Sequence, residues 1–531
     1  MKKVLAVVLS LILAFSIITV PASALDVSSL ANVSIENVFN TVIDKLIAFV
    51  LDYLNKYWPG YEDKWETVDE YVPENFFAGE ETFDKEVAED AQWSLGFAGA
   101  SLLEDIEPLN GEFFLGGTLE VFAGRVPTMV VDDQRVRVYA LSDGDATVVQ
   151  AVIDGFGLPR GDVQEIRARL ADFAAANNIT SINVSVLHQH SAIDTLGMNV
   201  PLAKALLLNT GNAAIGGTEA LVTKNPVFME NLYVKTVDSI KMAVADMEAG
   251  DLYYGSANIA ELIHDKREPF AYDENINRLR FVPEDEASEE TWILEAGIHC
   301  TMLGAGPDEL TADFPYYVEK AINEKVGANV VYVQGAELAL TTDCDTLDTE
   351  DMDDFERMAA YGYAIADRVI AISNDELLDP VLNIKMAEVA LNVDNEIHVL
   401  AGREGILNAV IIKDGDGGYK MMTEIGYMEL GNEVAVFLCP GEFEAAIIYG
   451  GPESGDAAWY GEEWTYAPLK DLTDCENVMV YGLCNDQAGY VLKDNEYHSW
   501  FTENEEINIV CETAGSAFAE AFEALVGSTV A

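Results

Sequence analysis

Two of the six histidines in the chain stand one residue apart, at His188 and His190. They follow the stretch Ile182–Leu187, in which apolar and polar residues alternate as they do in a β-strand. Because alternate side chains of a strand share one face, both imidazoles are expected on its apolar face, at its carboxyl end. Ligands bind at that edge of α/β sheets, and two neutral imidazole nitrogens suit zinc. The pair therefore indicates a zinc site, with a hydrogen-bonded pair of core histidines as the alternative.

Three other residues that can bind a metal also follow apolar stretches: His299, Glu442 and Tyr490. Each has a simpler explanation when it is taken alone. His299 could be a buried core histidine, Glu442 is one of 92 acidic residues, and Tyr490 could be an ordinary packed tyrosine. Spacing along the sequence does not show whether the three side chains meet. The other histidines are expected on the surface or in structural roles: His264, His398 and His498.

From about Gly96 onward, predicted strands alternate with predicted helices, and these elements would position the candidate residues. This order predicts an α/β fold, with one or more central β-sheets flanked by helices and the metal site at the carboxyl ends of strands. The glycine-rich run that starts at Asp414 lacks the later ligands of a calcium loop, so it is expected to be a hairpin turn. The predicted strands are Arg135–Leu141, Thr147–Val152, Ile182–Leu187, Val330–Val333, Ala409–Lys413, Val434–Leu438 and Val478–Leu483, and the predicted helices are Arg160–Asn177, Phe314–Val326 and Ala514–Leu525.

The beginning of the chain reads as a secretory signal over residues 1–24. Lys2 and Lys3 precede an apolar run, and a small-residue cleavage pattern ends at Ala24. No later stretch has the 18 or more continuous apolar residues of a membrane span. We therefore expect a secreted protein without a transmembrane segment.

Two further parts are expected after the signal: a helical and acidic segment over residues 25–92, and a catalytic domain over residues 93–531. Apolar residues recur at helical spacing between residues 34 and 54. That helix could pack on the catalytic domain, or it could act as a lid or a peripheral membrane contact.

The formal charge of −62 argues against nucleic acid as a partner, because phosphates would be repelled. Acidic runs at Glu62–Glu70 and Thr349–Asp354 are expected on solvated faces, where they could bind Ca²⁺ or Mg²⁺ loosely. The six cysteines are too few for a disulfide scaffold in a chain of 531 residues. They are expected to be small buried residues, with one or two disulfide bridges as the alternative.

Several blocks of the sequence, in one order, resemble the catalytic domain of the neutral/alkaline ceramidase family. The resemblance runs from about Gly96 to Glu503. The blocks are Asp154-Gly-Phe-Gly-Leu-Pro-Arg160, His188-Gln-His-Ser-Ala-Ile-Asp-Thr195, Lys266-Arg-Glu-Pro-Phe-Ala-Tyr272, His299, Thr311-Ala-Asp-Phe-Pro315, Pro440-Gly-Glu442 and Gly482-Leu-Cys-Asn485 with Tyr490-Val491.

The resemblance implies a zinc amidohydrolase that cleaves an N-acyl amide bond, in ceramide or a related lipid amide, with one zinc ion per chain. By position, the zinc ligands would be His188, His299, Glu442 and Tyr490. His190 would handle the proton, and Arg267 would polarise or anchor the substrate near its carbonyl. Two acidic residues could orient imidazoles from behind or could simply cap turns and helices: Asp194 and Asp313.

The sequence also departs from the family pattern. Where the family has Gly-Asp-Val-Ser-Pro-Asn, this chain has Gln334–Thr342, so the active-site serine maps to Thr341. A second tyrosine of the family falls at Thr502, and the loss of one such donor can cost about 10²-fold in rate. The family's carboxyl-terminal β-sandwich has no counterpart in the sequence.

A binding or surface protein with weak turnover is therefore one alternative, and a zinc esterase or peptidase is another. The sequence has neither a Gly-x-Ser-x-Gly nor a His-Glu-x-x-His motif.

Overall fold

Apolar strands build two β-sheets, and each of the predicted strands and helices is present. The computed structural model describes residues 54–57, 65–117, 124–199, 223–267, 270–303, 308–415, 417–451, 463–497 and 508–529, with the single positions 208, 211 and 215. All of them belong to the compact unit Leu51–Ala531. The amphipathic stretch of residues 34–54 falls almost entirely outside this range.

The first sheet has nine strands in the order β11-β9-β8-β6-β1-β3-β4-β5, and β13 pairs with β6. Its buried strands are rich in valine, isoleucine and leucine, as expected for strands that are covered on both faces. The strands are β1 (Ser94–Ser101), β3 (Arg135–Ser142), β4 (Thr147–Ile153), β5 (Ser181–Val186), β6 (Glu248–Asn258), β8 (Asn275–Pro283), β9 (Thr291–Ala296), β11 (Asn329–Gln334) and β13 (Glu376–Leu377).

This sheet is curled, and the curl decides which strand ends can meet. In a flat sheet of this order, β5 and β9 would lie far apart. The sheet turns where β1 joins β6, because only Ser94 and Leu95 of β1 pair across that junction. As a result, β11 packs against β3, β4 and β5 from the other half of the sheet.

The second sheet has the order β14-β16-β17-β19, with β15 beside β16. The turn that joins β15 to β16 starts at Asp414, whose amide donates to Gly418 O at 2.9 Å, so the predicted hairpin is confirmed.

Three pairs of short strands complete the β-structure. The strands are β14 (Leu382–Asn392), β15 (Ile411–Lys413), β16 (Tyr419–Leu430), β17 (Val434–Leu438) and β19 (Asn477–Tyr481), and the short pairs are β2 (Met129–Val130) with β10 (Glu309–Leu310), β7 (Ile263–Asp265) with β12 (Leu340–Thr342), and β18 (Glu442–Phe443) with β20 (Tyr490–Val491).

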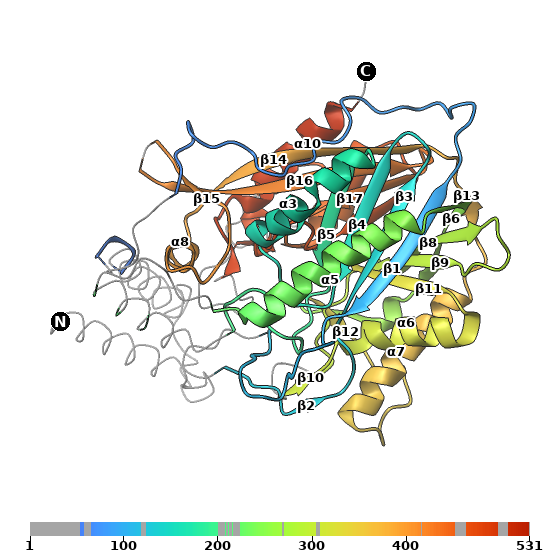
Figure 1. Cartoon of the computed structure of the whole chain (residues 1–531), viewed down its shortest axis with the longest axis horizontal. Helices are drawn as coiled ribbons and strands as arrows, with labels where there is room; N and C mark the ends of the chain where they lie inside the picture. The colour runs from blue at the N-terminus through green and yellow to red at the C-terminus, as the bar shows by residue number, and fades with distance from the viewer. Residues whose placement is uncertain are drawn as a thin grey trace. The chain divides into compact units, whose positions relative to one another are not determined.

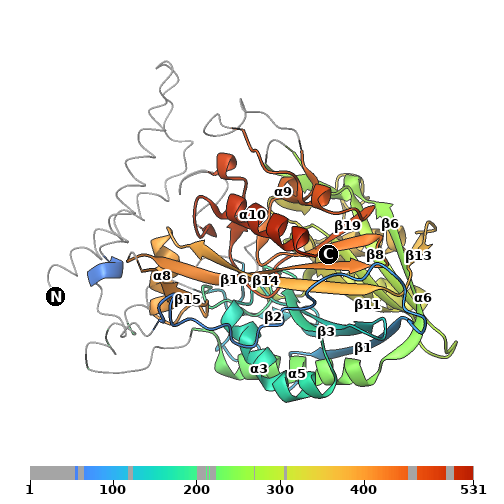
Figure 2. The same cartoon turned by 90° about the horizontal axis from the view of Figure 1, so that it is seen from above.

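Helices cover the outer faces of both sheets. Figure 1 shows α3 and α5 in front of β1, β3 and β4, and α6 and α7 beside β11. Seen from above in Figure 2, the order is α3 and α5, the first sheet, the second sheet and then α10. The helices are α3 (Arg160–Ala176), α5 (Pro226–Ala245), α6 (Asp313–Val326), α7 (Asp354–Ile370), α8 (Glu396–Arg403), α9 (Ala445–Tyr449) and α10 (Ala514–Gly527), with 3-10 turns η2 (Ala260–Leu262), η3 (Leu469–Leu472) and η4 (Asp494–Glu496).

Local sequence explains where these helices begin and end. Asn225 caps α5, with Pro226 at the first helical position, and Asp353 forms a capping box with Glu356 at the start of α7. Gly327 ends α6 in the left-handed conformation that glycine adopts without steric cost.

Buried ion pairs join α3 to the second sheet. Arg167 of α3 donates two hydrogen bonds to the carboxylate of Glu424 on β16, at 2.6 and 3.1 Å. Arg160 pairs with Glu388 of β14 and lies 3.4 Å from Glu424. The side chains of Arg160, Arg167 and Glu424 are almost fully buried. Breaking such a pair leaves an uncompensated buried charge, so these contacts hold the layers in one arrangement.

Residues 65–92 lie along the second sheet. Thr67 forms a bridge with Lys413 of β15, and Gly79 forms one with Lys385 of β14. Tyr71 donates a hydrogen bond to Glu388 at 2.5 Å. This part of the acidic segment is therefore continuous with the main body.

All six cysteines are free thiols, and five of them are buried, as small core residues would be. Across the ranges that the structure describes, no helix is both long enough and apolar enough to cross a membrane.

Candidate metal centre

The chain after β5 turns sharply and brings His188 to the centre of the candidate site. The expected alternation of side chains from Ile182 to His190 is wrong at its end, because β5 stops at Val186 and His188 has φ 55°. A left-handed residue other than glycine costs about 1–3 kcal/mol and persists where its surroundings enforce it. The His188 Nδ1 lies 2.7 Å from the carbonyl oxygen of Phe156.

His299 follows β9 and is held in the same way. Its Nδ1 lies 3.0 Å from Glu337 O and 3.1 Å from Leu340 O, and its backbone amide also donates to Leu340 O. A carbonyl oxygen can only accept, so Nδ1 carries the proton in both histidines. The Nε2 atoms of His188 and His299 are then left with free lone pairs.

Both lone pairs are aimed at one carboxylate oxygen, Oε2 of Glu442. The distance from Oε2 is 3.3 Å to His188 Nε2 and 3.2 Å to His299 Nε2. Ligands bonded at about 2.0–2.1 Å in a tetrahedral zinc site lie about 3.3 Å from one another. Three acceptors at this spacing repel each other unless a proton or a cation lies between them. The three residues, all more than nine-tenths buried, fit a divalent metal ion.

The acidity of Glu442 reflects the same geometry. Burial alone would raise the pKa of its carboxyl group. The charges and hydrogen bonds of His188 and His299 outweigh burial and lower the pKa from its ordinary value.

A second carboxylate, Glu337, lies in the same cluster. It is fully buried, and a ligand atom of each of His188, His299, Glu337 and Glu442 lies within 4.8 Å of the other three. Burial and the charge of Glu442 raise the pKa of Glu337 well above its usual range. Sequence reasoning missed this residue, although it follows the strand Val330–Val333 just as the predicted ligands follow theirs.

His190 adjoins the cluster, and a ligand atom of each of His188, His190 and His299 lies within 4.8 Å of the other two. Its ring centroid is 4.8 Å from that of His188 and 5.8 Å from that of His299. Burial, with the neighbouring His188 and His299, lowers the pKa of His190 well below 6.5, so the ring is neutral. Its Nε2 is buried and has no hydrogen-bond partner among the described residues. The structure thus provides a neutral imidazole nitrogen beside the cluster, available to accept a proton.

Tyr490 lies beside Glu442 through strand pairing. The short strands β18 and β20 are parallel, and Glu442 is paired with Tyr490. The Glu442 amide donates to Gly489 O at 3.0 Å, and the Gln487 side chain lies 3.4 Å from Glu442 Oε1. The sequence-predicted residues His188, His190, His299, Glu442 and Tyr490 therefore come from the ends of four strands, β5, β9, β17 and β19, to one region.

The segment Gly482–Asn485 holds these strand ends together. The Gly482 amide donates to Gln334 O of β11, the Cys484 amide to Cys439 O, and the Asn485 amide to Val184 O of β5. The Asn485 side chain accepts from the Val184 amide at 2.9 Å, which continues the strand ladder. A Cβ at Gly482 would lie 2.4 Å from Gly335 O, so this position requires glycine.

Thr341 lies on β12, whose Leu340 carbonyl accepts from the His299 amide, and Arg267 follows β7. Strand β7 pairs with β12, so His264 lies opposite Thr341, and the Thr341 hydroxyl is 3.3 Å from that of Thr301. The Arg267 guanidinium donates to Glu496 O at 2.5 Å. Thr341 thus contacts another side-chain hydroxyl and Arg267 contacts a backbone carbonyl, and their catalytic roles stay predictions.

Asp194 and Asp313 cap backbone turns and do not orient the imidazoles. Asp194 accepts from the amides of Leu196, Gly197 and Asn199. Asp313 accepts from the amides of Met302 and Phe314 at the start of α6. Backbone carbonyls orient the two imidazoles instead. Every residue has a backbone carbonyl, so the sequence alone could not identify these partners.

The other histidines differ in burial. His264 is exposed on β7, and His398 is buried in α8, where burial lowers its pKa to about 4. His498 lies outside the described residues, as does Thr502.

Comparison with solved structures finds the same architecture in neutral ceramidases. The crystal structure of neutral ceramidase from Pseudomonas aeruginosa matches with a TM-score of 0.62 and 13% identity, over 82% of this chain and 74% of that one. A ceramidase complexed with C2 matches with a TM-score of 0.59 and 12% identity, over 82% of this chain and 75% of that one. By sequence alone, the chain matches neither a family model nor a curated protein. The chain therefore has the fold of the neutral ceramidases.

Proposed function

We propose that the protein is an exported, zinc-dependent amidohydrolase that cleaves an N-acyl amide bond, with ceramide as the leading substrate. The observation that carries the proposal is the convergence of His188 Nε2, His299 Nε2 and Glu442 Oε2, at the spacing of metal ligands. The fold shared with ceramidases supports the choice of substrate class. The signal-like residues 1–24 support export.

The chain's own residues would divide the chemistry between them. His188, His299 and Glu442, with Tyr490 beside them, would hold the ion. Bound there, zinc would acidify water and withdraw electrons from an amide carbonyl. His190 would accept a proton at Nε2 and return it to the departing amine, which its neutral state and unpaired nitrogen allow. Arg267 would anchor the substrate near its carbonyl oxygen.

A binding protein with weak turnover is the second candidate. Two observations favour it: threonine at position 341 where the related enzymes have serine, and threonine at 502 where they have tyrosine. The complete set of acceptors argues for an enzyme, because a protein that only binds lipids has no need of a costly buried metal cluster. A zinc esterase or peptidase would use the same residues on another substrate.

The test combines metal analysis with an assay. We expect about one zinc ion per purified chain and release of fatty acid from a short-chain fluorescent ceramide, which a chelator abolishes and added zinc restores. His188→Ala and His299→Ala should lose both metal and activity. His264→Ala, at an exposed histidine on β7, is the matched control and should keep both.

Each outcome has a clear meaning. A folded wild-type protein that binds no metal would rule out the zinc site. Full zinc loading without hydrolysis of ceramide or any other N-acyl amide would favour the binding protein. Cleavage of esters or peptides alone would select the third candidate.

A further inference from the structure

Glu337 is a buried carboxyl group with one oxygen atom that no neighbouring described residue satisfies. None of its surface is exposed, and its Oε2 accepts a hydrogen bond from the side-chain Nε2 of Gln334. Its Oε1 is buried without a hydrogen-bond partner among the residues that the structure describes. An ionised carboxylate in such a place is costly unless a cation is beside it.

Among the residues that the structure describes, no arginine or lysine pairs with Glu337. Across the described ranges, the ion-pair partners of Glu337 and Glu442 are the imidazoles of His188 and His299. Two carboxylates and one divalent ion sum to zero charge. A ligand atom of Glu337 lies within 4.8 Å of one from each of His188, His299 and Glu442, so an ion bound by those three would lie close to Glu337 as well.

The alternative role for Glu337 is to orient His299 from behind, and the distances disfavour it. Glu337 Oε2 lies 3.8 Å from His299 Nδ1, beyond hydrogen-bond reach. The single proton on Nδ1 already points to two backbone carbonyls, those of Glu337 and Leu340. The backbone carbonyl of Glu337 therefore orients the His299 ring. The Glu337 side chain has no part in that contact.

We propose that Glu337 coordinates the same metal ion as His188, His299 and Glu442, so that this site contains two carboxylates. The inference rests on the metal site of the proposed function. Glu337 belongs to the segment Gln334–Thr342, where the sequence departs from the ceramidase pattern. The second carboxylate is therefore a feature of this chain that the resemblance does not supply.

The experiment measures zinc affinity and the zinc coordination shell of the purified full-length protein. Affinity is obtained by competition with a chelating dye, and the shell by X-ray absorption at the zinc edge. In Glu337→Gln we expect zinc to bind at least ~10²-fold more weakly, since even outer-shell losses reach that size. We also expect the shell to lose one oxygen donor.

Glu295→Gln is the matched control. Glu295 on β9 is also a buried carboxylate, it accepts a hydrogen bond from Asn277 at 2.8 Å, and it is not part of the cluster of possible ligands among the described residues. Its replacement should leave affinity and shell unchanged. Glu337→Asp keeps the carboxylate and should recover part of the zinc affinity. This variant shows whether the loss in Glu337→Gln comes from the missing carboxylate or from misfolding.

A folded Glu337→Gln variant with wild-type affinity and an unchanged shell would overturn this inference and leave the proposed function standing. A wild-type protein that binds no zinc would overturn both. A wild-type protein that binds zinc through Glu337 but cleaves no amide would remove the function and keep the inference.

Discussion

At the scale of single residues, the candidate site depends on which nitrogen of each histidine is free. His188 and His299 both use Nδ1 on backbone carbonyls, which leaves Nε2 for the cluster. The sequence could identify both histidines, because each follows an apolar strand. It could not identify what orients them, because Phe156, Glu337 and Leu340 contribute only carbonyl oxygens, which every residue has. Glu337 was missed although it also follows a strand, since one glutamate among 92 acidic residues does not stand out until its burial is known.

His190→Ala tests the division of labour within the cluster. We expect turnover to fall by about 10²–10⁴-fold, because a placed imidazole contributes that much through proton transfer. Zinc content should stay near the wild-type value, since His190 lies beside the cluster. The measurement is kcat on the fluorescent ceramide together with metal analysis.

Thr341→Ala is the matched comparison, because Thr341 also lies close to His299. It should retain activity at a reduced level if water, and not the hydroxyl, attacks the substrate. A complete loss in Thr341→Ala with little effect in His190→Ala would instead make the threonine hydroxyl the nucleophile and leave His190 without a part in proton transfer.

At the scale of elements, the short strands and helices could be predicted, but the pairing between distant strands could not. Strand Val434–Leu438 matches β17 residue for residue, because apolar patterning is local. The curl between β1 and β6 has no local signature. It depends on two residue pairs and on the packing of β11 against β5, all distant in sequence. The convergence of His188 and His299 follows from that curl. The sequence could therefore suggest the site, but it could not show that the two imidazoles meet.

Arg167→Met tests the buried ion pairs between α3 and the second sheet. We expect the free energy of unfolding to fall by about 3–5 kcal/mol, because Glu424 loses a buried partner. Urea unfolding followed by circular dichroism would measure it.

Arg169→Met provides the control two residues further along α3. Its partners Glu165 and Glu230 are largely exposed, so the change should cost under about 1 kcal/mol. Equal effects of the two substitutions would mean that the buried network does not hold the layers together.

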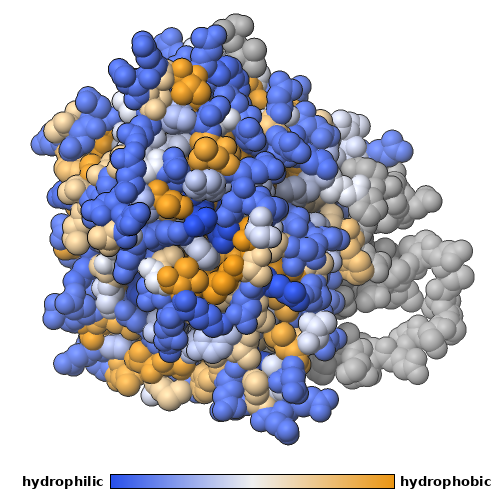
Figure 3. Space-filling view, turned by 90° about the vertical axis from the view of Figure 1, so that its right-hand side faces the viewer, coloured by the Kyte–Doolittle hydropathy of each residue, from blue (hydrophilic) through white to orange (hydrophobic). Residues whose placement is uncertain are grey.

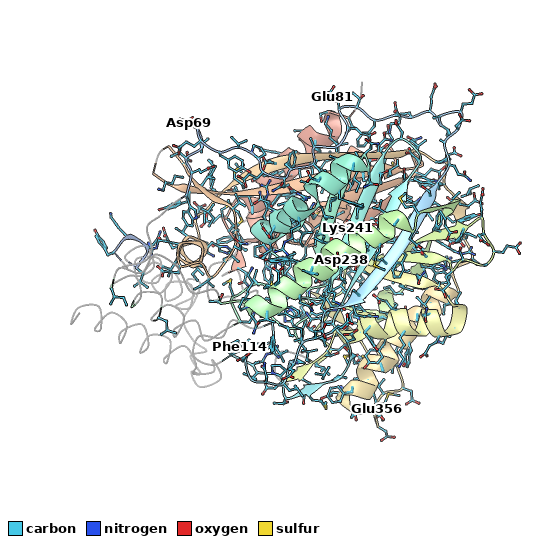
Figure 4. The ribbon with its side chains drawn as sticks, viewed as in Figure 1. Asp69, Glu81, Phe114, Asp238, Lys241 and Glu356 are labelled. Atoms are coloured by element: carbon cyan, nitrogen blue, oxygen red, sulfur yellow. The ribbon has the colours of Figure 1, made fainter. Side chains whose placement is uncertain are left out.

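At the scale of the whole molecule, charge dominates the surface. The formal charge is −62, and the side chains of Glu81 and Glu356 point away from the body into solvent (Figure 4). On the face shown in Figure 3, hydrophilic residues surround small, separate hydrophobic patches. A lipid surface of the same sign should therefore repel the protein.

This repulsion predicts a dependence on lipid charge. Hydrolysis of ceramide should be faster on vesicles of phosphatidylcholine alone than on vesicles that also contain phosphatidylserine. The difference should shrink as salt is raised, since the screening length is about 8 Å at physiological ionic strength and shorter above it. Rates on both vesicles would be compared over a salt series. Faster hydrolysis on the anionic vesicles would show that a local basic surface governs docking.

Glu442 follows β17 of the second sheet, whereas His188 and His299 follow strands of the first, so metal binding at this site would be linked to folding. His299 and Glu442 are 143 positions apart in sequence, and contacts of such separation form slowly. A chain whose two sheets have not yet docked has no complete set of ligands, so it cannot capture the ion tightly. A divalent ion that binds only the docked state stabilises it by RT ln(1 + [L]/Kd). Metal supply would then set the fraction of newly made chains that reach, and keep, the native arrangement of the two sheets.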